Sequence, residues 1–216
     1  MTEITNRVLV ASGLILLAIV AAWLEGKGFP AVYWLGLLVG AGMIFEFLRC
    51  LWHAPRDVMF NVNNLVLFVL FLGLLGLDFA SLMTVGRRPM IILMVLTIIC
   101  AADIGAWLFG RIIGGDKLWE KVSEHKTWAG QIFGVICGTL AAILYGNTFL
   151  TSFAPQLIWI GISISLLSQY GDLTASCIKR RMKIKDFSHV LGSHGGIIDR
   201  FDGWIYVLPI IWFVLM

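Results

Sequence analysis

Long apolar segments, separated by short polar ones, run through the whole 216-residue chain. An apolar stretch of about 20 residues forms a helix long enough to cross the hydrocarbon core of a bilayer. On this pattern we predict seven membrane-spanning helices, over residues 8–24, 31–48, 65–85, 90–109, 129–148, 155–173 and from about 197 to the C-terminus. Pro89 and Pro155 stand at the expected beginnings of two of them, where a missing backbone N–H costs little. Only Arg7 precedes the segment 8–24 and six spans follow it, so we interpret it as a membrane helix rather than a cleaved signal peptide.

The last apolar segment is short, because only 13 residues follow Gly203. That length of helix is shorter than the hydrocarbon core of a bilayer. We therefore expect the last helix to begin near Ile197. Such a helix would draw Asp199, Arg200 and Asp202 below the membrane surface.

The composition agrees with this pattern: 59% of the residues are hydrophobic and 13% are charged. Soluble domains carry about 25% charged residues, so we predict an all-α, polytopic integral membrane protein. Its length allows one membrane domain over 1–216, with N-terminal helices in 1–89 and, in 90–216, the helices that flank both long polar segments. The four cysteines form no C-x-x-C pair, which argues against a zinc site or a disulfide. The 23 glycines suit close packing of helices in lipid.

The placement of charge predicts the orientation. If seven helices alternate, 13 of the 16 basic residues fall on one side of the membrane. The exceptions are Lys27, Arg87 and Arg88. The positive-inside rule then places the N-terminus and both long polar loops in the cytoplasm. We predict an inner-membrane protein whose long polar loops face the cytoplasm.

A polar island, residues 176–202, stands out between the apolar segments. Just before it and within it, Asp172, Ser176 and Lys179 have the spacing of one helix face, and so do Asp199 and Asp202. Carboxylates at the depth of a membrane are costly and are rarely kept without a cation or substrate to hold. Three carboxylates on two helix ends would suit one or two hard divalent cations. The alternative is a set of intrahelical salt bridges, with the lysines on lipid headgroups.

The island closely resembles the signature of phosphatidate cytidylyltransferases, also called CDP-diacylglycerol synthases. The matching positions are Ser176, Ile178, Lys179, Arg180, Lys185, Asp186, Ser188, Leu191, Gly192, His194, Gly195, Gly196, Ile197, Asp199, Arg200, Phe201 and Asp202. A looser upstream block is also similar to that family, with Asp103, Gly105, Ala106, Gly110, Arg111, Gly114, Lys117, Leu118, Ser123, Lys126, Thr127, Trp128 and Gly130. In this second block Glu124, His125 and Ala129 replace the proline, lysine and glutamate usual in the family.

The resemblance implies transfer of a cytidylyl group from CTP to phosphatidate, with Mg²⁺ as cofactor and a second cation left open. It implies a catalytic set of Asp172, Lys179, Arg180, Lys185, Asp186, His194, Asp199, Arg200 and Asp202. Substrate contacts would come from Lys126, Thr127, Ser176, Gly195 and Gly196, and metal ligands from Asp172, Asp199 and Asp202.

Several roles within that set follow from general chemistry. The Gly195–Gly196 pair would let the backbone approach a phosphate. His194 would either donate to a phosphate oxygen or make an orienting hydrogen bond.

Three further polar residues lie outside that set. Glu46 either matches a membrane-border acidic residue of the family or makes a polar contact between helices. Asp78 and His53 have no pattern around them, and we expect both at the surface.

Other functions remain open on the sequence. The enzyme alternatives are a CTP-dependent transferase with an ether- or isoprenoid-lipid phosphate as acceptor, or a polyprenol kinase. A cation-coupled transporter is the alternative of another class, although the charges gather on one side rather than at the midplane. An inactive homologue is also open. Expected partners are CTP, phosphatidate and membrane lipids, with no nucleic acid, and a homodimer is left open.

Overall fold

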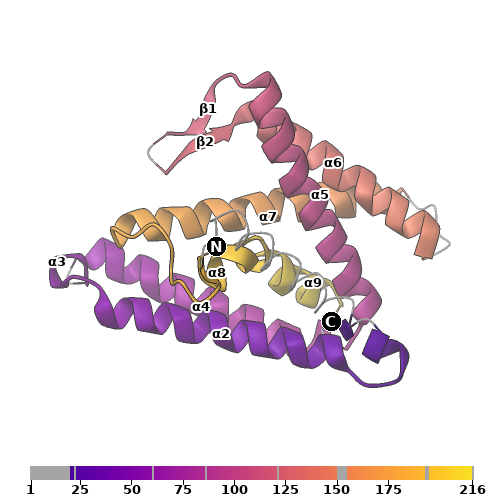
Figure 1. Cartoon of the computed structure of the whole chain (residues 1–216), viewed down its shortest axis with the longest axis horizontal. Coiled ribbons are helices and arrows are strands. Elements are labelled where there is room, and N and C mark those ends of the chain that lie inside the picture. The colour runs from indigo at the N-terminus through magenta and orange to yellow at the C-terminus, as the bar shows by residue number, and fades with distance from the viewer. Residues whose placement is uncertain are drawn as a thin grey trace. The chain divides into compact units, whose positions relative to one another are not determined.

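The computed structural model describes residues 20–21, 23–59, 61–85, 87–120, 122–149, 155–192 and 195–215 (Figure 1). The chain divides into two compact units. The first unit comprises Met1–Pro89 with Cys177–Met216, and the second comprises Met90–Ser176. The boundary after Pro89 coincides with the expected division between N-terminal and catalytic helices. Residues 177–216, however, group with the N-terminal part of the chain.

The first unit contains two long helices and a set of short ones. Its elements are α2 (Ala31–His53), α3 (Arg56–Met59), α4 (Val62–Val85), α8 (Ile198–Phe201), the 3₁₀ helix η2 (Asp202–Trp204) and α9 (Val207–Leu215). Helix α2 packs along α4, α9 also packs on α4, and α8 contacts α2 (Figure 1). The C-terminal elements therefore close onto the N-terminal helices within this unit.

The second unit is built from helices and one small hairpin. Its elements are α5 (Pro89–Ile113), β1 (Lys117–Trp119), β2 (Ser123–Thr127), α6 (Trp128–Phe149) and α7 (Gln156–Arg181). Helix α5 begins at Pro89, and α7 begins directly after Pro155, as predicted. The antiparallel hairpin β1–β2 was not predicted, because the polar segment that forms it has no alternation of apolar residues. The division between the units falls within α7.

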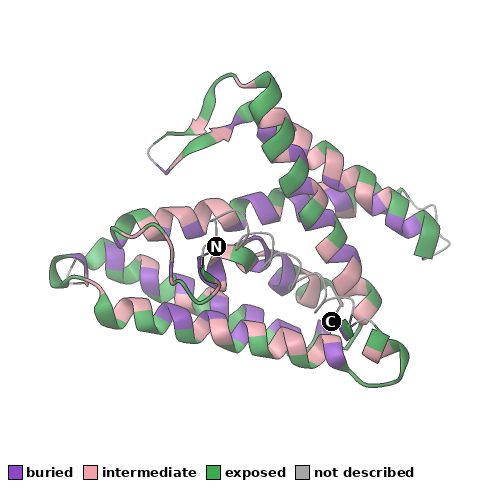
Figure 2. Cartoon of the chain, in the orientation of Figure 1, coloured by how far each residue is buried: buried purple, intermediate pink, exposed green. Residues whose placement is uncertain are grey.

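Four of the described helices are long and apolar enough to span a membrane: α2, α4, α5 and α6. They match four of the predicted spans. The predicted span 8–24 lies almost entirely outside the described residues. Exposed residues recur along these helices (Figure 2). Large apolar side chains are among them, including Leu38, Phe45 and Leu70. A surface of this kind is stable against lipid, so the chain is a helical membrane protein.

The prediction of one continuous last helix from about residue 197 was wrong. The chain forms α8, turns through η2 and begins α9 only at Val207. A charged stretch holding Asp199, Arg200 and Asp202 separates the apolar residues of α9 from Ile197. Asp199 in this stretch is buried and forms an ion pair with Lys179 instead of continuing a lipid-facing helix.

Four phenylalanines form the centre of the first unit. The ring of Phe47 on α2 meets Phe71 on α4 edge-on at 4.9 Å between centroids, and Phe68 also contacts Phe47. Phe187 stacks on Phe71 at 6.2 Å with an interplanar angle of 8°. Aromatic pairs of this geometry add to the stability given by burial alone. The residue that follows Asp186 in the polar island is thus part of the core.

In the second unit, small residues let α5 and α6 approach closely. A side chain on Gly130 would lie 2.6 Å from the carbonyl oxygen of Ala106, and one on Gly138 would lie 3.2 Å from that of Ile98. Helix interfaces in membranes favour small residues for this reason. The expected use of glycine for helix packing is confirmed here.

Asp78 is not a surface residue, contrary to the expectation. It is buried on α4, and its Oδ1 has no hydrogen-bond partner among the described residues. An isolated acidic residue in an apolar segment gives no sign of which helix face it occupies. His53 is exposed, as expected, and contacts the carbonyl oxygen of Arg49 at 2.8 Å.

Candidate functional site

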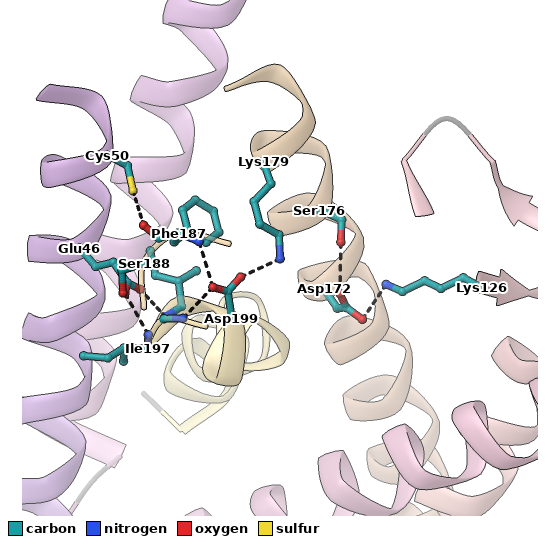
Figure 3. A network of polar contacts seen from close by, with 12 residues as sticks. Glu46, Cys50, Lys126, Asp172, Ser176, Lys179, Phe187, Ser188, Ile197 and Asp199 are labelled. Carbon is teal, nitrogen blue, oxygen red and sulfur yellow. Dashed lines mark hydrogen bonds and ion pairs between the residues drawn. The ribbon is translucent and has the colours of Figure 1, made fainter. Parts of the chain in front are cut away.

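Asp199, the first aspartate of the α8 segment, is held by three donors within the first unit (Figure 3). Its Oδ1 is 2.7 Å from the ammonium of Lys179, near the end of α7. Its Oδ2 accepts hydrogen bonds from the backbone N–H groups of Phe187 at 2.9 Å and Gly196 at 2.8 Å. Only 4% of the Asp199 side chain is exposed. A charged group this buried needs such partners, and here both oxygens have them.

The partner lysine is also enclosed. The Lys179 side chain is 13% exposed, and its ammonium lies 5.7 Å from the centroid of the Phe187 ring. A cation over an aromatic face is attracted by the ring's quadrupole. Lys179, Asp199 and Phe187 therefore form one buried electrostatic group.

A second carboxylate, Glu46 on α2, binds the same part of the chain (Figure 3). It is 4% exposed and accepts hydrogen bonds from the Ser188 hydroxyl and from the backbone N–H groups of Ile197 at 3.1 Å and Ile198 at 2.7 Å. We call residues 187–198 the signature loop. Glu46 thus makes a polar contact, and its partner is this loop rather than another long helix.

The two glycines of the signature loop lie against these carboxylates. Gly195 has a φ of +79°, and a side chain there would lie 2.8 Å from Oδ2 of Asp199. A side chain on Gly196 would overlap the Glu46 carboxylate. Both positions therefore exclude a Cβ because the backbone approaches carboxylates. This is a different reason from the phosphate contact that the sequence predicted.

In the second unit, Asp172 on α7 is more open than Asp199. Its Oδ2 is 2.6 Å from the ammonium of Lys126 on β2, and its Oδ1 accepts a long hydrogen bond of 3.4 Å from Ser176 (Figure 3). The Asp172 side chain is 40% exposed and that of Lys126 is 26% exposed. The Lys126 contact is an ion pair rather than an aligned hydrogen bond. The predicted sharing of a face by Asp172 and Ser176 is confirmed.

Both Asp172 and Lys126 line a cavity of about 870 Å³. The charged side chains around it are Asp103, Arg111, Lys117, Lys126 and Asp172. A pocket of this size is large enough for a nucleotide, since ligand pockets are typically about 300–1,000 Å³. Its three cations suit phosphate groups. Asp103 and Lys117 belong to the upstream block that the sequence singled out.

The hairpin and its junction with α6 position this cavity. β2 carries Lys126, and the next residue, Thr127, is buried. Thr127 directly precedes α6 and caps its N-terminus, because its hydroxyl accepts a hydrogen bond of 3.1 Å from the backbone N–H of Gly130. Thr127 thus has a structural contact at a position predicted to bind substrate.

The remaining predicted residues are distributed around the first unit. Arg180, Lys185 and Arg200 are exposed, whereas Asp186 and Asp202 are half-buried. Asp186 lines a second cavity of about 500 Å³ together with Arg49, His53 and His189. His194 lies outside the described residues.

The fit of these residues to a magnesium ion differs between the two units. Carboxylate oxygens are the ligands that Mg²⁺ prefers. Asp172 fits, because it is partly exposed and shares its cavity with a second carboxylate, Asp103. Asp199 would have to give up Lys179 before it could bind a metal, because its oxygens already accept three contacts. Within each unit, the described residues contain no group of three His, Cys, Asp or Glu side chains placed to hold one ion.

Sequence reasoning missed two parts of this arrangement. Glu46 is separated from Ser188 by 142 residues, so no local spacing connects them. The available signal was its position as an acidic residue in an apolar helix, which is costly unless it is satisfied. Asp103 belongs to the upstream block, but it was not predicted as a site residue, and the structure places it on the cavity.

Comparisons with known proteins agree with the signature. The model of the cytidylyltransferase family matches residues 2–216. The phosphatidate cytidylyltransferase of Rickettsia bellii (strain RML369-C) is 29% identical over 218 residues, covering 95% of this chain and 88% of the relative. That of Rickettsia felis (strain ATCC VR-1525 / URRWXCal2) is 31% identical over 194 residues, covering 86% and 82%. That of Staphylococcus aureus (strain COL) is 39% identical over 122 residues, covering 56% and 46%.

Proposed function

Because the chain belongs to the cytidylyltransferase family, we propose that it transfers a cytidylyl group from CTP to phosphatidate, giving CDP-diacylglycerol and pyrophosphate. The observation that carries the proposal is the match to a phosphatidate cytidylyltransferase over 95% of the chain and 88% of the relative. The cluster of cations and carboxylates around Asp172 supports it, because this chemistry suits a polyphosphate substrate.

In the proposed reaction, an oxygen of the phosphatidate phosphate attacks the α-phosphorus of CTP. A new phosphorus–oxygen bond forms while the bond from the α-phosphorus to the bridging oxygen breaks, and pyrophosphate leaves with that electron pair. The attacking phosphate is ionised at neutral pH, so no general base is required. The main demand on the protein is to align the two phosphates and to stabilise charge on the leaving group.

The described residues offer cations for both tasks. Lys126, Arg111 and Lys117 line the cavity of the second unit and would bind the CTP phosphates. Arg180 and Lys185, in the polar island, are exposed and would contact phosphates. Mg²⁺ would neutralise phosphate charge, and Asp172, which is partly exposed in the cavity of the second unit, is the residue that fits it best.

The test of this function is a reaction with purified protein in detergent, supplied with Mg²⁺, CTP and phosphatidate. We expect pyrophosphate and CDP-diacylglycerol in equal amounts, and neither product when phosphatidate is omitted. A polyprenol kinase would instead yield CDP without pyrophosphate when given a polyprenol. Absence of both products from folded protein would contradict the proposal and favour an inactive homologue or a transporter.

We also propose that the protein lies in the inner membrane with the polar island facing the cytoplasm, where CTP is available. The support is the basic asymmetry of the predicted loops. In a background without the four native cysteines, Lys183→Cys should resist an impermeant thiol reagent added to intact cells. Arg87→Cys, on the predicted outer side, is the matched control and should be labelled. Labelling at position 183 without permeabilisation would overturn the orientation. Whether the protein forms a homodimer would be measured by the mass of the protein–detergent complex.

A further inference from the structure

Both carboxylate oxygens of Glu46 accept hydrogen bonds, although Glu46 lies on α2, a helix long and apolar enough to span a membrane. Oε1 accepts from the Ser188 hydroxyl and from the N–H of Ile197, and Oε2 accepts from the N–H of Ile198. A buried carboxylate is costly unless such donors satisfy it. Loss of either side of these bonds would leave unsatisfied groups in the core of the first unit.

The donors come from both ends of the signature loop. Ser188 lies near its beginning, and Ile197 and Ile198 lie at its end. Asp199 joins the same two ends by accepting from Phe187 and Gly196. Each end of the loop is thus bound by two carboxylates, one from α2 and one from α8.

Of these two carboxylates, Asp199 belongs to the signature and Glu46 does not. Helix α8 has four residues and makes too few internal hydrogen bonds to be stable alone. The Glu46 bonds to Ile197 and Ile198 fix the backbone directly before Asp199 and Arg200. The position of these two predicted site residues therefore depends on a side chain about 150 residues away in sequence.

We propose that Glu46 is a positioning residue for the cytidylyl transfer, acting by tying the signature loop to α2. The inference rests on the proposed function for its catalytic part. Its structural part, the tie itself, is independent of the substrate. Glu46 contacts no substrate in this role and acts through Ser188 and the backbone of α8.

The test is Glu46→Gln, which keeps the size of the side chain but replaces one acceptor oxygen with an NH₂ group. We expect the KM for CTP to rise by at least about fivefold, in keeping with the loss of a charged hydrogen bond. A smaller fraction of active enzyme would lower kcat but leave KM unchanged, so KM separates positioning from partial unfolding. Hydrogen exchange, followed by mass spectrometry, should become faster in peptides that cover the signature loop.

Glu25→Gln is the matched control. Glu25 also accepts a backbone hydrogen bond, from Val32 at 3.0 Å, but it lies outside the site. We expect this variant to keep the wild-type KM and the wild-type exchange of the loop. If Glu46→Gln fails to accumulate, Ser188→Ala tests the same tie, and we expect its KM to rise by at least about twofold.

A double variant measures whether Ser188 acts through Glu46. Glu46→Gln with Ser188→Ala should have nearly the same kcat/KM as Glu46→Gln alone, because coupled residues are not additive. Additive losses, an unchanged KM, or unchanged loop exchange would each overturn the inference. Absence of activity in the wild-type protein would overturn the proposed function instead, and the exchange experiment would still decide whether the tie exists.

Discussion

Asp199 and Asp172 each pair with a lysine, but their surroundings differ. The Asp199 side chain is 4% exposed and accepts two backbone hydrogen bonds in addition to Lys179. The Asp172 side chain is 40% exposed, pairs with Lys126 and lines a large cavity. The same residue type thus maintains a loop in one unit and faces a ligand-sized space in the other. The charge of Asp199 is committed to the fold, whereas the charge of Asp172 remains accessible to a substrate.

Asp199→Asn should have the largest effect, because it leaves Lys179 buried without its counter-charge. We expect the free energy of unfolding to fall by about 3 kcal/mol, as for other broken buried ion pairs. Turnover should fall by at least about a hundredfold. Activity assays and thermal unfolding in detergent would measure both. Wild-type stability together with lost turnover would mean that Asp199 acts on the substrate and not on the loop.

Asp172→Asn should lower turnover while leaving the free energy of unfolding nearly unchanged. Because its ion pair is partly exposed, we expect the free energy of unfolding to change by less than about 1 kcal/mol. Turnover should still fall by at least about tenfold if Asp172 contacts phosphates or their metal ion. If the free energy of unfolding fell as much in Asp172→Asn as in Asp199→Asn, the two aspartates would not differ in their structural role.

Gly196→Ala tests the packing of the loop on Glu46. The new methyl group would overlap the Glu46 carboxylate, and we expect a loss of about 1–2 kcal/mol in the free energy of unfolding. Gly73→Ala on α4 is the matched control, because a side chain there meets nothing within 4 Å. Equal stability of the two variants would show that Glu46 does not need this glycine.

Lys183→Ala should have the smallest effect. Lys183 pairs with Asp57 at 2.7 Å, and both side chains are 65% exposed. Its hydrogen bond lowers the pKa of Asp57, so any contribution is present at neutral pH and is lost as the pH falls through that lowered pKa. We expect turnover to change by less than about threefold, in line with the small effect of surface pairs. A larger fall in turnover for Lys183→Ala would show that Lys183 has a role beyond its exposed pair with Asp57.

Local patterns predicted what local contacts determine. The apolar segments gave α2, α4, α5 and α6, and the spacing of Asp172 and Ser176 gave their contact on α7. Pro89 marked the beginning of α5 because its missing N–H is tolerated there. The signature identified the residues around Asp199 but not the partners of that carboxylate.

Long-range packing determined the rest. No spacing rule connects Glu46 to Ile198 across 152 residues. The burial of Asp78 depends on which face of α4 is covered, which its neighbours in sequence do not reveal. The last segment was predicted as one helix from the length needed to cross a bilayer, whereas the chain breaks between α8 and α9 in the charged stretch after Ile197.

The tie between Glu46 and the signature loop also imposes an order on biosynthesis. A membrane chain is made from its N-terminus, so α2 emerges long before the residues that will satisfy its carboxylate. Glu46 can find the N–H of Ile198 only after 152 further residues have been added. Until then the nascent chain must keep this acidic group hydrated at the membrane. The late arrival of its partners makes assembly of the signature loop a closing step of folding rather than an early one.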